Sequence, residues 1–248
     1  MAIDTHTFVT QQLEVLNPEA YASLVDAFLA SCRDNGAEVA FKCMGHPLSY
    51  AQLEQASRAF AGYLRNETAL GPGDRVAIQL PNLLQYPIAA WGALRAGMVL
   101  VNTNPMYTAR ELAYQLRDSG ARAIVILEAL LGSHEQVIAE SGVEGVISVH
   151  PADLAQPRPA PASKLEKLVS FSDALARGGA GEFVAQPMRM SDTAALQYTG
   201  GTTGVAKGAI LSHGNLFAAC RISKESFPLG LEEGEREVVI APMPLYHV

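Results

Sequence analysis

The chain has 248 residues, of which 49% are hydrophobic and 17% are charged. This composition is typical of a globular protein with one large or two small domains, and it excludes a disordered chain. A net charge of −7 argues against a general nucleic-acid-binding surface, so nucleic acid is not an expected partner. Cys32, Cys43 and Cys220 lack metal-ligand spacing, and no histidine pairs with them, so no metal site is expected.

The amino terminus does not resemble a signal peptide, because Met1–His6 has neither a cationic start nor an apolar core segment. The most apolar stretch, Tyr86–Val101, is too short for a membrane span and contains Arg95 and Gly97. The sequence therefore predicts a soluble, cytoplasmic protein.

Capping residues and alternating patterns predict the first elements. Ser23 with Asp26, and Ser49 with Gln52, are typical helix starts. The expected elements are a helix from Ser23 to about Asn35, a hairpin of Val39–Cys43 and Pro47–Tyr50, and a long amphipathic helix from Ser49 to about Asn66.

After a turn at Gly71–Asp74, apolar strands alternate with helices. The expected strands are Arg75–Leu80, Met98–Val101, Ala123–Leu127 and Gly145–Val149, and the expected helices are Leu83–Ala96, Thr108–Gly120 and Leu130–Glu140. Such alternation predicts an α/β fold, a doubly wound and mostly parallel sheet with helices on both faces.

The next part of the chain is less regular. Pro151–Pro161 holds four prolines and is expected to be a surface connection. A weak helical signal covers Phe171–Ala176, and Gly178–Gly181 predicts a break. Two apolar strands, Thr193–Tyr198 and Gly208–Leu211, then flank a loop, and a further helix opens near Asn215.

That loop, residues 198–208, reads Tyr-Thr-Gly-Gly-Thr-Thr-Gly-Val-Ala-Lys-Gly. Glycines let backbone N–H groups converge, threonines add donors and Lys207 adds charge, which together suit a nucleotide polyphosphate. It is neither a Walker A loop, because Gly208 follows Lys207, nor a dinucleotide fingerprint. The alternative is a flexible Gly/Thr turn. The loop follows the carboxyl end of a strand, where open α/β sheets bind ligands.

Residues 196–209 resemble the phosphate-binding signature of the adenylate-forming superfamily, which includes acyl-CoA synthetases, luciferases and peptide-synthetase adenylation domains. Residues 94–107, 111–121 and 241–248 resemble three further signatures of the same superfamily. The amino-acid sequences of these segments are most similar to those of bacterial long-chain fatty acid–CoA ligases.

The phosphate loop supplies most of the candidate site residues. Thr202 and Thr203 are expected to donate to the β- and γ-phosphates and Lys207 to hold phosphate, with Lys207 and Thr202 as candidate catalytic residues. Tyr198 is left open between a ligand contact and a packing residue. The candidate nucleotide-binding residues are Tyr198, Thr199, Gly200, Gly201, Thr202, Thr203, Gly204, Lys207 and Gly208.

Two histidines near these segments receive different interpretations. On its own pattern, a lone histidine such as His247 is usually structural. The resemblance instead places His247 at the acyl pocket, lining or gating the carboxylate site. His213 is interpreted as structural.

The resemblance implies a two-step ligase. A fatty acid carboxylate attacks the α-phosphate of Mg²⁺-ATP to give acyl-adenylate and pyrophosphate, and the thiol of coenzyme A then displaces AMP. ATP, Mg²⁺, CoA and a fatty acid are therefore the expected cofactors and substrates. The alternatives are a ligase for an aryl, medium-chain or amino acid, and a non-catalytic nucleotide-binding fragment. A homodimer and peripheral contact with the inner face of the membrane are left open.

The resemblance also implies an incomplete N-terminal ATP-binding domain, inactive alone, because the family's Tyr-Gly-x-Thr-Glu segment and C-terminal domain are not in this sequence. Its expected portions are 1–68 (helix–hairpin–helix), 69–220 (the α/β portion with loop 198–208) and 221–248 (the start of the next sheet). The helices before residue 68 are expected to leave their apolar faces uncovered, because their partner strands would lie beyond residue 248.

Overall fold

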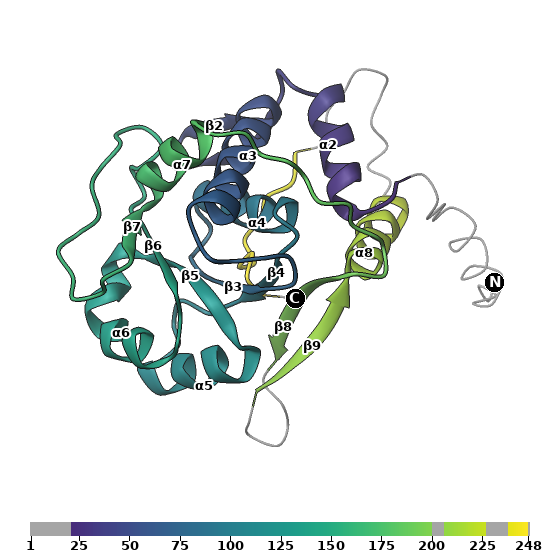
Figure 1. Ribbon diagram of the computed structural model, residues 1–248. Coiled ribbons are helices and arrows are strands. Elements are labelled where there is room, and N and C mark those ends of the chain that lie inside the picture. The colour runs from purple at the N-terminus through teal and green to yellow at the C-terminus, as the bar shows by residue number, and fades with distance from the viewer. Residues whose placement is uncertain (1–20, 200–205, 227–237, 248) are drawn as a thin grey trace.

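A central sheet organises the computed structural model, which describes residues 21–199, 206–226 and 238–247. Its strands are β3 (Arg75–Gln79), β4 (Val99–Asn102), β5 (Ala121–Leu127), β6 (Gly145–Val149), β7 (Leu168–Ser170), β8 (Thr193–Thr199) and β9 (Lys207–Ser212). They lie in the order β7-β6-β5-β3-β4-β8-β9 (Figure 1). Every neighbouring pair is parallel except β8 and β9, which form an antiparallel hairpin.

Helices cover both faces of this sheet (Figure 1). One face carries α3 (Tyr50–Asn66), α4 (Gln85–Arg95) and α7 (Phe171–Gly179), and α2 (Leu24–Asp34) and α8 (His213–Ser226) extend the same core. The other face carries α5 (Ala109–Ser119) and α6 (Glu128–Glu140). The predicted doubly wound fold is confirmed.

Strand β5 shows why the sheet is covered twice. Its residues are apolar without interruption from Ala123 onward, and alternate side chains point to opposite faces. Ala123 and Val125 join the core under α3 and α4, whereas Ile124 and Ile126 join the core under α5 and α6. All four are fully buried, so this part of the strand has no solvent-facing side.

The predicted helix caps are present. The Ser49 side chain accepts from the Gln52 backbone, and the Gln52 side chain accepts from Ser49 N, which completes a capping box at α3. Thr108 and Glu111 do the same at α5. Gly120 ends α5 in the left-handed region with φ 61°, a conformation that glycine adopts without strain.

Some boundaries differ from the sequence prediction. The short strand β7 was not predicted, and α8 begins at His213 rather than near Asn215. Helix α7 runs through Gly178, where a break was expected. A Cβ at Gly178 would lie 2.0 Å from Ala59 O, so this glycine lets α7 approach α3 closely instead of ending the helix.

A small antiparallel hairpin precedes α3. It pairs β1 (Val39–Cys43) with β2 (His46–Ser49). Its turn residues are Met44 and Gly45, at φ 50° and 83°. Positive φ at both central residues is typical of a type I′ hairpin turn.

The expectation of uncovered apolar faces in the amino-terminal helices is wrong for the described residues. In α3, Leu53, Phe60 and Leu64 are buried, and the Phe60 ring lies 5.3 Å from that of Phe171 in α7. In α2, Phe28 stacks on Trp91 of α4 with ring centroids 4.0 Å apart. Helices α4 and α7 thus supply the surface that the prediction assigned to further strands.

The carboxyl-terminal described residues form no additional sheet. Residues 221–226 continue α8, and residues 238–247 have no strand. The three-part division of the chain stays a prediction.

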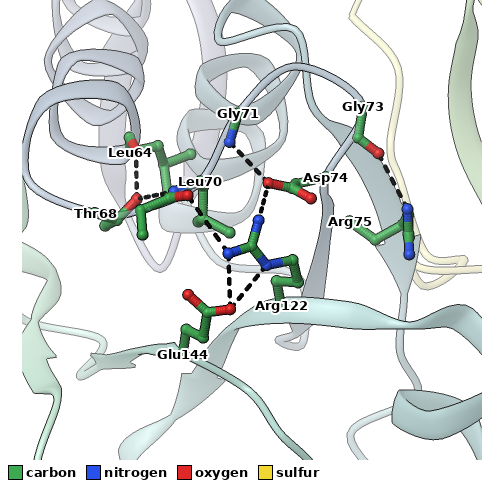
Figure 2. Close-up of polar contacts among 10 residues, drawn as sticks. Leu64, Thr68, Leu70, Gly71, Gly73, Asp74, Arg75, Arg122 and Glu144 are labelled. Carbon is green, nitrogen blue, oxygen red and sulfur yellow. Dashed lines mark hydrogen bonds and ion pairs between the residues drawn. The ribbon is translucent and has the colours of Figure 1, made fainter.

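An ion-pair network ties the sheet together at the amino ends of its strands (Figure 2). Arg122 of β5 contacts Asp74 Oδ2 at 2.5 Å and Glu144 Oε1 at 2.7 Å. Asp74 also accepts from Gly71 N at 2.8 Å, which fixes the turn before β3. The two carboxylates raise the pKa of the Arg122 guanidinium. This network stabilises the end of the sheet where the strands begin, and the predicted phosphate loop lies at the opposite end, where the strands finish.

Candidate functional site

The carboxyl ends of β3 and β4 form the point where the chain connections diverge. Strand β3 leads to α4 on one face, and its neighbour β4 leads to α5 on the other face. Open α/β sheets bind ligands in the crevice at such a point. The last described residues, 241–247, reach this end of the sheet, where Tyr86 Oη of α4 lies 2.9 Å from Leu245 O (yellow in Figure 1).

A hydrogen-bonded network spans this edge. Asn102, at the end of β4, accepts at Oδ1 from Tyr86 Oη at 2.7 Å and donates from Nδ2 to Gln197 Oε1 at 2.8 Å. Its backbone carbonyl accepts from Gln115 Nε2 of α5 at 2.9 Å. One asparagine therefore links α4, β4, β8 and α5.

The phosphate loop is carried by the β8–β9 hairpin. The last paired residues are Thr199 and Lys207, which lie opposite each other in register, and both are exposed. Residues 200–206 connect them, and of these the structure describes Ala206. The predicted donors Gly200, Gly201, Thr202, Thr203 and Gly204 therefore lie outside the described residues.

Helix α5 supports both ends of that loop. Tyr198 Oη donates to Asp118 Oδ2 at 2.6 Å, and Tyr114 Oη donates to Ala206 O at 3.1 Å. Burial, and then the Asp118 carboxylate, raise the pKa of the Tyr198 phenol. Tyr198 has a packing role in this structure, and its contact with nucleotide stays a prediction.

Gly208 is needed for the packing of Tyr198. A Cβ at Gly208 would lie 3.0 Å from both Cε2 and Cζ of the Tyr198 ring. The glycine thus lets β9 run close over the ring. Its role in nucleotide binding stays a prediction.

The two histidines lie in different environments. His247 is exposed, and its backbone N–H donates to Pro244 O at 3.0 Å. His213 is buried, its backbone N–H donates to Asp192 O at 3.0 Å, and desolvation lowers its imidazole pKa. His247 follows Tyr246, whose carbonyl is bound by Gln197, so it is at the same sheet edge as the loop.

A groove of about 640 Å³ lies at the other end of the sheet. Its lining includes Arg75, Val99 and Thr193, the first residues of β3, β4 and β8, together with His213. Because ligands of open α/β sheets bind at carboxyl ends, we assign the candidate site to the network and loop instead.

Sequence reasoning did not identify the side chains of the network. Asn102 and Gln197 had a usable signal, since each is a polar residue at the carboxyl end of an apolar strand. Tyr86 lies in the apolar stretch Tyr86–Val101 and is buried, but its hydroxyl belongs to the site. Asp118 and Tyr114 carry no local signal.

Metal ligands and membrane spans can be described for residues 21–199, 206–226 and 238–247. Within them, no group of three or more histidine, cysteine, aspartate or glutamate side chains could hold a metal ion. No helix in that part of the chain has the length and apolar character to cross a membrane.

The mostly parallel sheet covered on both faces, with the β8–β9 hairpin at one side, places the chain in the doubly wound α/β class. Residues 28–248 match the family described as AMP-binding enzyme, and the chain belongs to that family. The resemblance to adenylate-forming enzymes is therefore confirmed.

Individual relatives agree with this family assignment. The chain is 42% identical over 247 residues to a long-chain-fatty-acid–CoA ligase of Escherichia coli O6:H1, covering 94% of this chain and 44% of that protein. The chain thus spans less than half the length of this curated relative.

Two solved structures share the fold. A putative long-chain-fatty-acid CoA ligase from Rhodopseudomonas palustris matches with TM-score 0.71 and 22% identity, over 91% of this chain and 52% of that one. ATP-bound MatB from the same species matches with TM-score 0.64 and 26% identity, over 82% and 37%.

Proposed function

We propose that this chain forms part of a long-chain fatty acid–CoA ligase. The observation that carries the proposal is the 42% identity with the Escherichia coli ligase across 94% of this chain. The position of the loop and of residues 241–247 at one sheet edge supports it, because a reaction between a carboxylate and a nucleotide needs both substrates there.

The proposed first step joins the fatty acid to AMP. A carboxylate oxygen attacks the α-phosphorus of ATP, and the bond from that phosphorus to pyrophosphate breaks. Loop N–H groups, with Thr202 and Thr203, hold the β- and γ-phosphates of the leaving pyrophosphate, and Lys207 balances their charge. Positioning and charge stabilisation account for most catalysis of this kind.

The proposed second step forms the thioester. The thiol of coenzyme A attacks the acyl carbon, and AMP leaves. ATP as a ligand is supported by the ATP-bound MatB structure, which shares this fold. Mg²⁺, as a partner of the ATP phosphates, and coenzyme A are proposed from the family resemblance. His247 is proposed to line the carboxylate site.

ATP–pyrophosphate exchange with a panel of carboxylates tests the proposal. It should be run on this chain and on an extended chain, in which the remaining carboxyl-terminal sequence of the Escherichia coli relative follows residue 248. The extended chain should exchange pyrophosphate with palmitate and form palmitoyl-CoA. The 248-residue chain should form no palmitoyl-CoA above background. Exchange driven only by benzoate, by medium-chain acids or by amino acids would favour the alternative ligases.

Localisation and assembly need separate measurements. We propose a cytoplasmic enzyme that contacts the inner face of the membrane, because long-chain fatty acids partition into bilayers. A homodimer is also left open. Flotation with anionic vesicles and sedimentation of the extended chain measure these two properties.

A further inference from the structure

Residues 241–247 are held without secondary structure. They form neither helix nor strand, so their backbone polar groups need partners elsewhere in the molecule. Ala241, Pro242 and Met243 are exposed, whereas Leu245 and Tyr246 are half-buried against the core. The path of this segment therefore depends on the side chains that bind its backbone.

Asn82 makes three of those contacts. Its Nδ2 donates to Ala241 O at 3.2 Å and to Met243 O at 3.0 Å, and its Oδ1 accepts from Leu245 N at 2.8 Å. An asparagine suits this task because one side chain offers both donors and an acceptor. Asn82 follows β3, so it stands at the carboxyl edge of the sheet.

Tyr86 and Gln197 hold the next two residues. Tyr86 Oη lies 2.9 Å from Leu245 O, and Gln197 Nε2 donates to Tyr246 O at 3.0 Å. Both side chains are buried. Gln197 Oε1 accepts from Asn102 Nδ2, and the single hydroxyl proton of Tyr86 is shared between Asn102 Oδ1 and Leu245 O, so contacts with Asn102 orient both side chains. Side chains at the carboxyl ends of the strands thus set the position of the residue that follows, His247.

We propose that Asn82, Tyr86 and Gln197 are positioning residues for the carboxylate site, acting through the backbone of residues 241–247. This proposal rests on the proposed ligase function, in which His247 lines that site. Misplacing a group near the reacting atoms by about 1 Å can cost about 100-fold in rate. Losing these contacts should therefore affect the carboxylate substrate and spare ATP, which the loop holds.

Variants of the extended chain test the proposal. Asn82→Ala removes all three contacts, and Asn82→Asp keeps the acceptor for Leu245 N but faces two carbonyls with a carboxylate oxygen. Gln197→Met removes the donor to Tyr246 O. The control is Asn66→Ala at the end of α3, which removes a comparable amide donor to another backbone carbonyl, Glu182 O at 2.9 Å.

We expect the three site variants to raise the KM for palmitate about tenfold, the effect of losing one to two net hydrogen bonds. The KM for ATP should change less than about twofold, and Asn66→Ala should change neither. Equal losses for palmitate and ATP, or no loss for either, would overturn the proposal while leaving the ligase function intact.

A second measurement does not depend on activity. Hydrogen exchange in the 248-residue chain should show the Leu245 amide protected in the parent and in Asn66→Ala, and exposed in Asn82→Ala. An unchanged Leu245 rate in Asn82→Ala overturns the positioning role. If none of the carboxylates in the panel supports pyrophosphate exchange by the extended parent, the ligase function fails, and so does the assignment to a carboxylate site. The Leu245 rate then still decides whether Asn82 holds the segment.

Discussion

Tyr198 donates a 2.6 Å hydrogen bond to Asp118, a residue 80 positions away on α5. Tyr114, on the same helix, binds the carbonyl of Ala206 on the other side of the loop. The chain therefore enters and leaves the phosphate loop at points fixed by one helix. The capping box at Thr108 and the left-handed Gly120 define the two ends of that helix. A helix with defined ends can hold both ends of the loop at a constant separation.

The first prediction concerns this anchor. Tyr198→Phe removes the bond to Asp118 and should lower the free energy of unfolding by about 1 kcal/mol, a typical net value for one hydrogen bond. Denaturant titration of the 248-residue chain measures it. The control is Tyr21→Phe, because the Tyr21 ring packs on Phe217 at 5.9 Å and lies away from the loop. Equal stability of the parent and both variants would show that the bond contributes nothing.

The second prediction concerns pH. Burial, and then Asp118, raise the pKa of Tyr198 above its ordinary value of 10.0. The folded state therefore keeps this proton after the unfolded state has lost it. The stabilisation is complete below pH 10 and falls as the pH rises above it. Thermal melts from pH 8 to 11 should show a steeper alkaline loss for the parent than for Tyr198→Phe. Parallel curves would contradict the prediction.

The third prediction concerns Lys207 in the extended chain. Lys207→Ala removes one charge-assisted contact to phosphate, worth about 1.5–3 kcal/mol, so kcat/KM for ATP should fall about ten- to a hundredfold. The melting temperature should hold, because Lys207 is exposed at the end of the hairpin. Gly204→Val should be worse if that position needs positive φ. Normal ATP kinetics in both variants would remove the loop from the site.

Local patterns predicted most of the scaffold. The Ser49–Gln52 and Thr108–Glu111 boxes are encoded within four residues, and the apolar strands between them identify a parallel sheet. Strand β7 escaped prediction because it has only three residues. The cover of α3 was misjudged because its partners, α4 and α7, come together only in the folded chain.

The site was harder to predict because its contacts are distant in sequence. Asn82 meets Met243 across 161 positions, and no short motif specifies that pair. Only the order of the strands brings the carboxyl ends of β3, β4 and β8 together. The loop could be found from sequence because its donors are consecutive. The residues that support the loop and segment 241–247 could not be found from sequence, because each lies far along the chain from the residue that it binds.

The last prediction concerns self-association of the 248-residue chain. Strand β9 is the edge strand of the sheet in the described part of the chain, and its Ile210 is 70% exposed. Val238, Val239 and Ile240 are 72–87% exposed as well. An open sheet edge and exposed apolar residues both favour association between copies. We therefore expect oligomers in sedimentation experiments, and Ile210→Lys should raise the monomer fraction.

Val39→Lys is the matched control, because Val39 is 56% exposed on β1, which belongs to the separate two-stranded sheet. This variant should leave the oligomers unchanged. Hydrogen exchange should protect α3 nearly as well as β5, since both are buried in the same core. A parent chain that sediments only as a monomer would refute the association through β9. Rapid hydrogen exchange in α3 would show that α4 and α7 do not cover its apolar face.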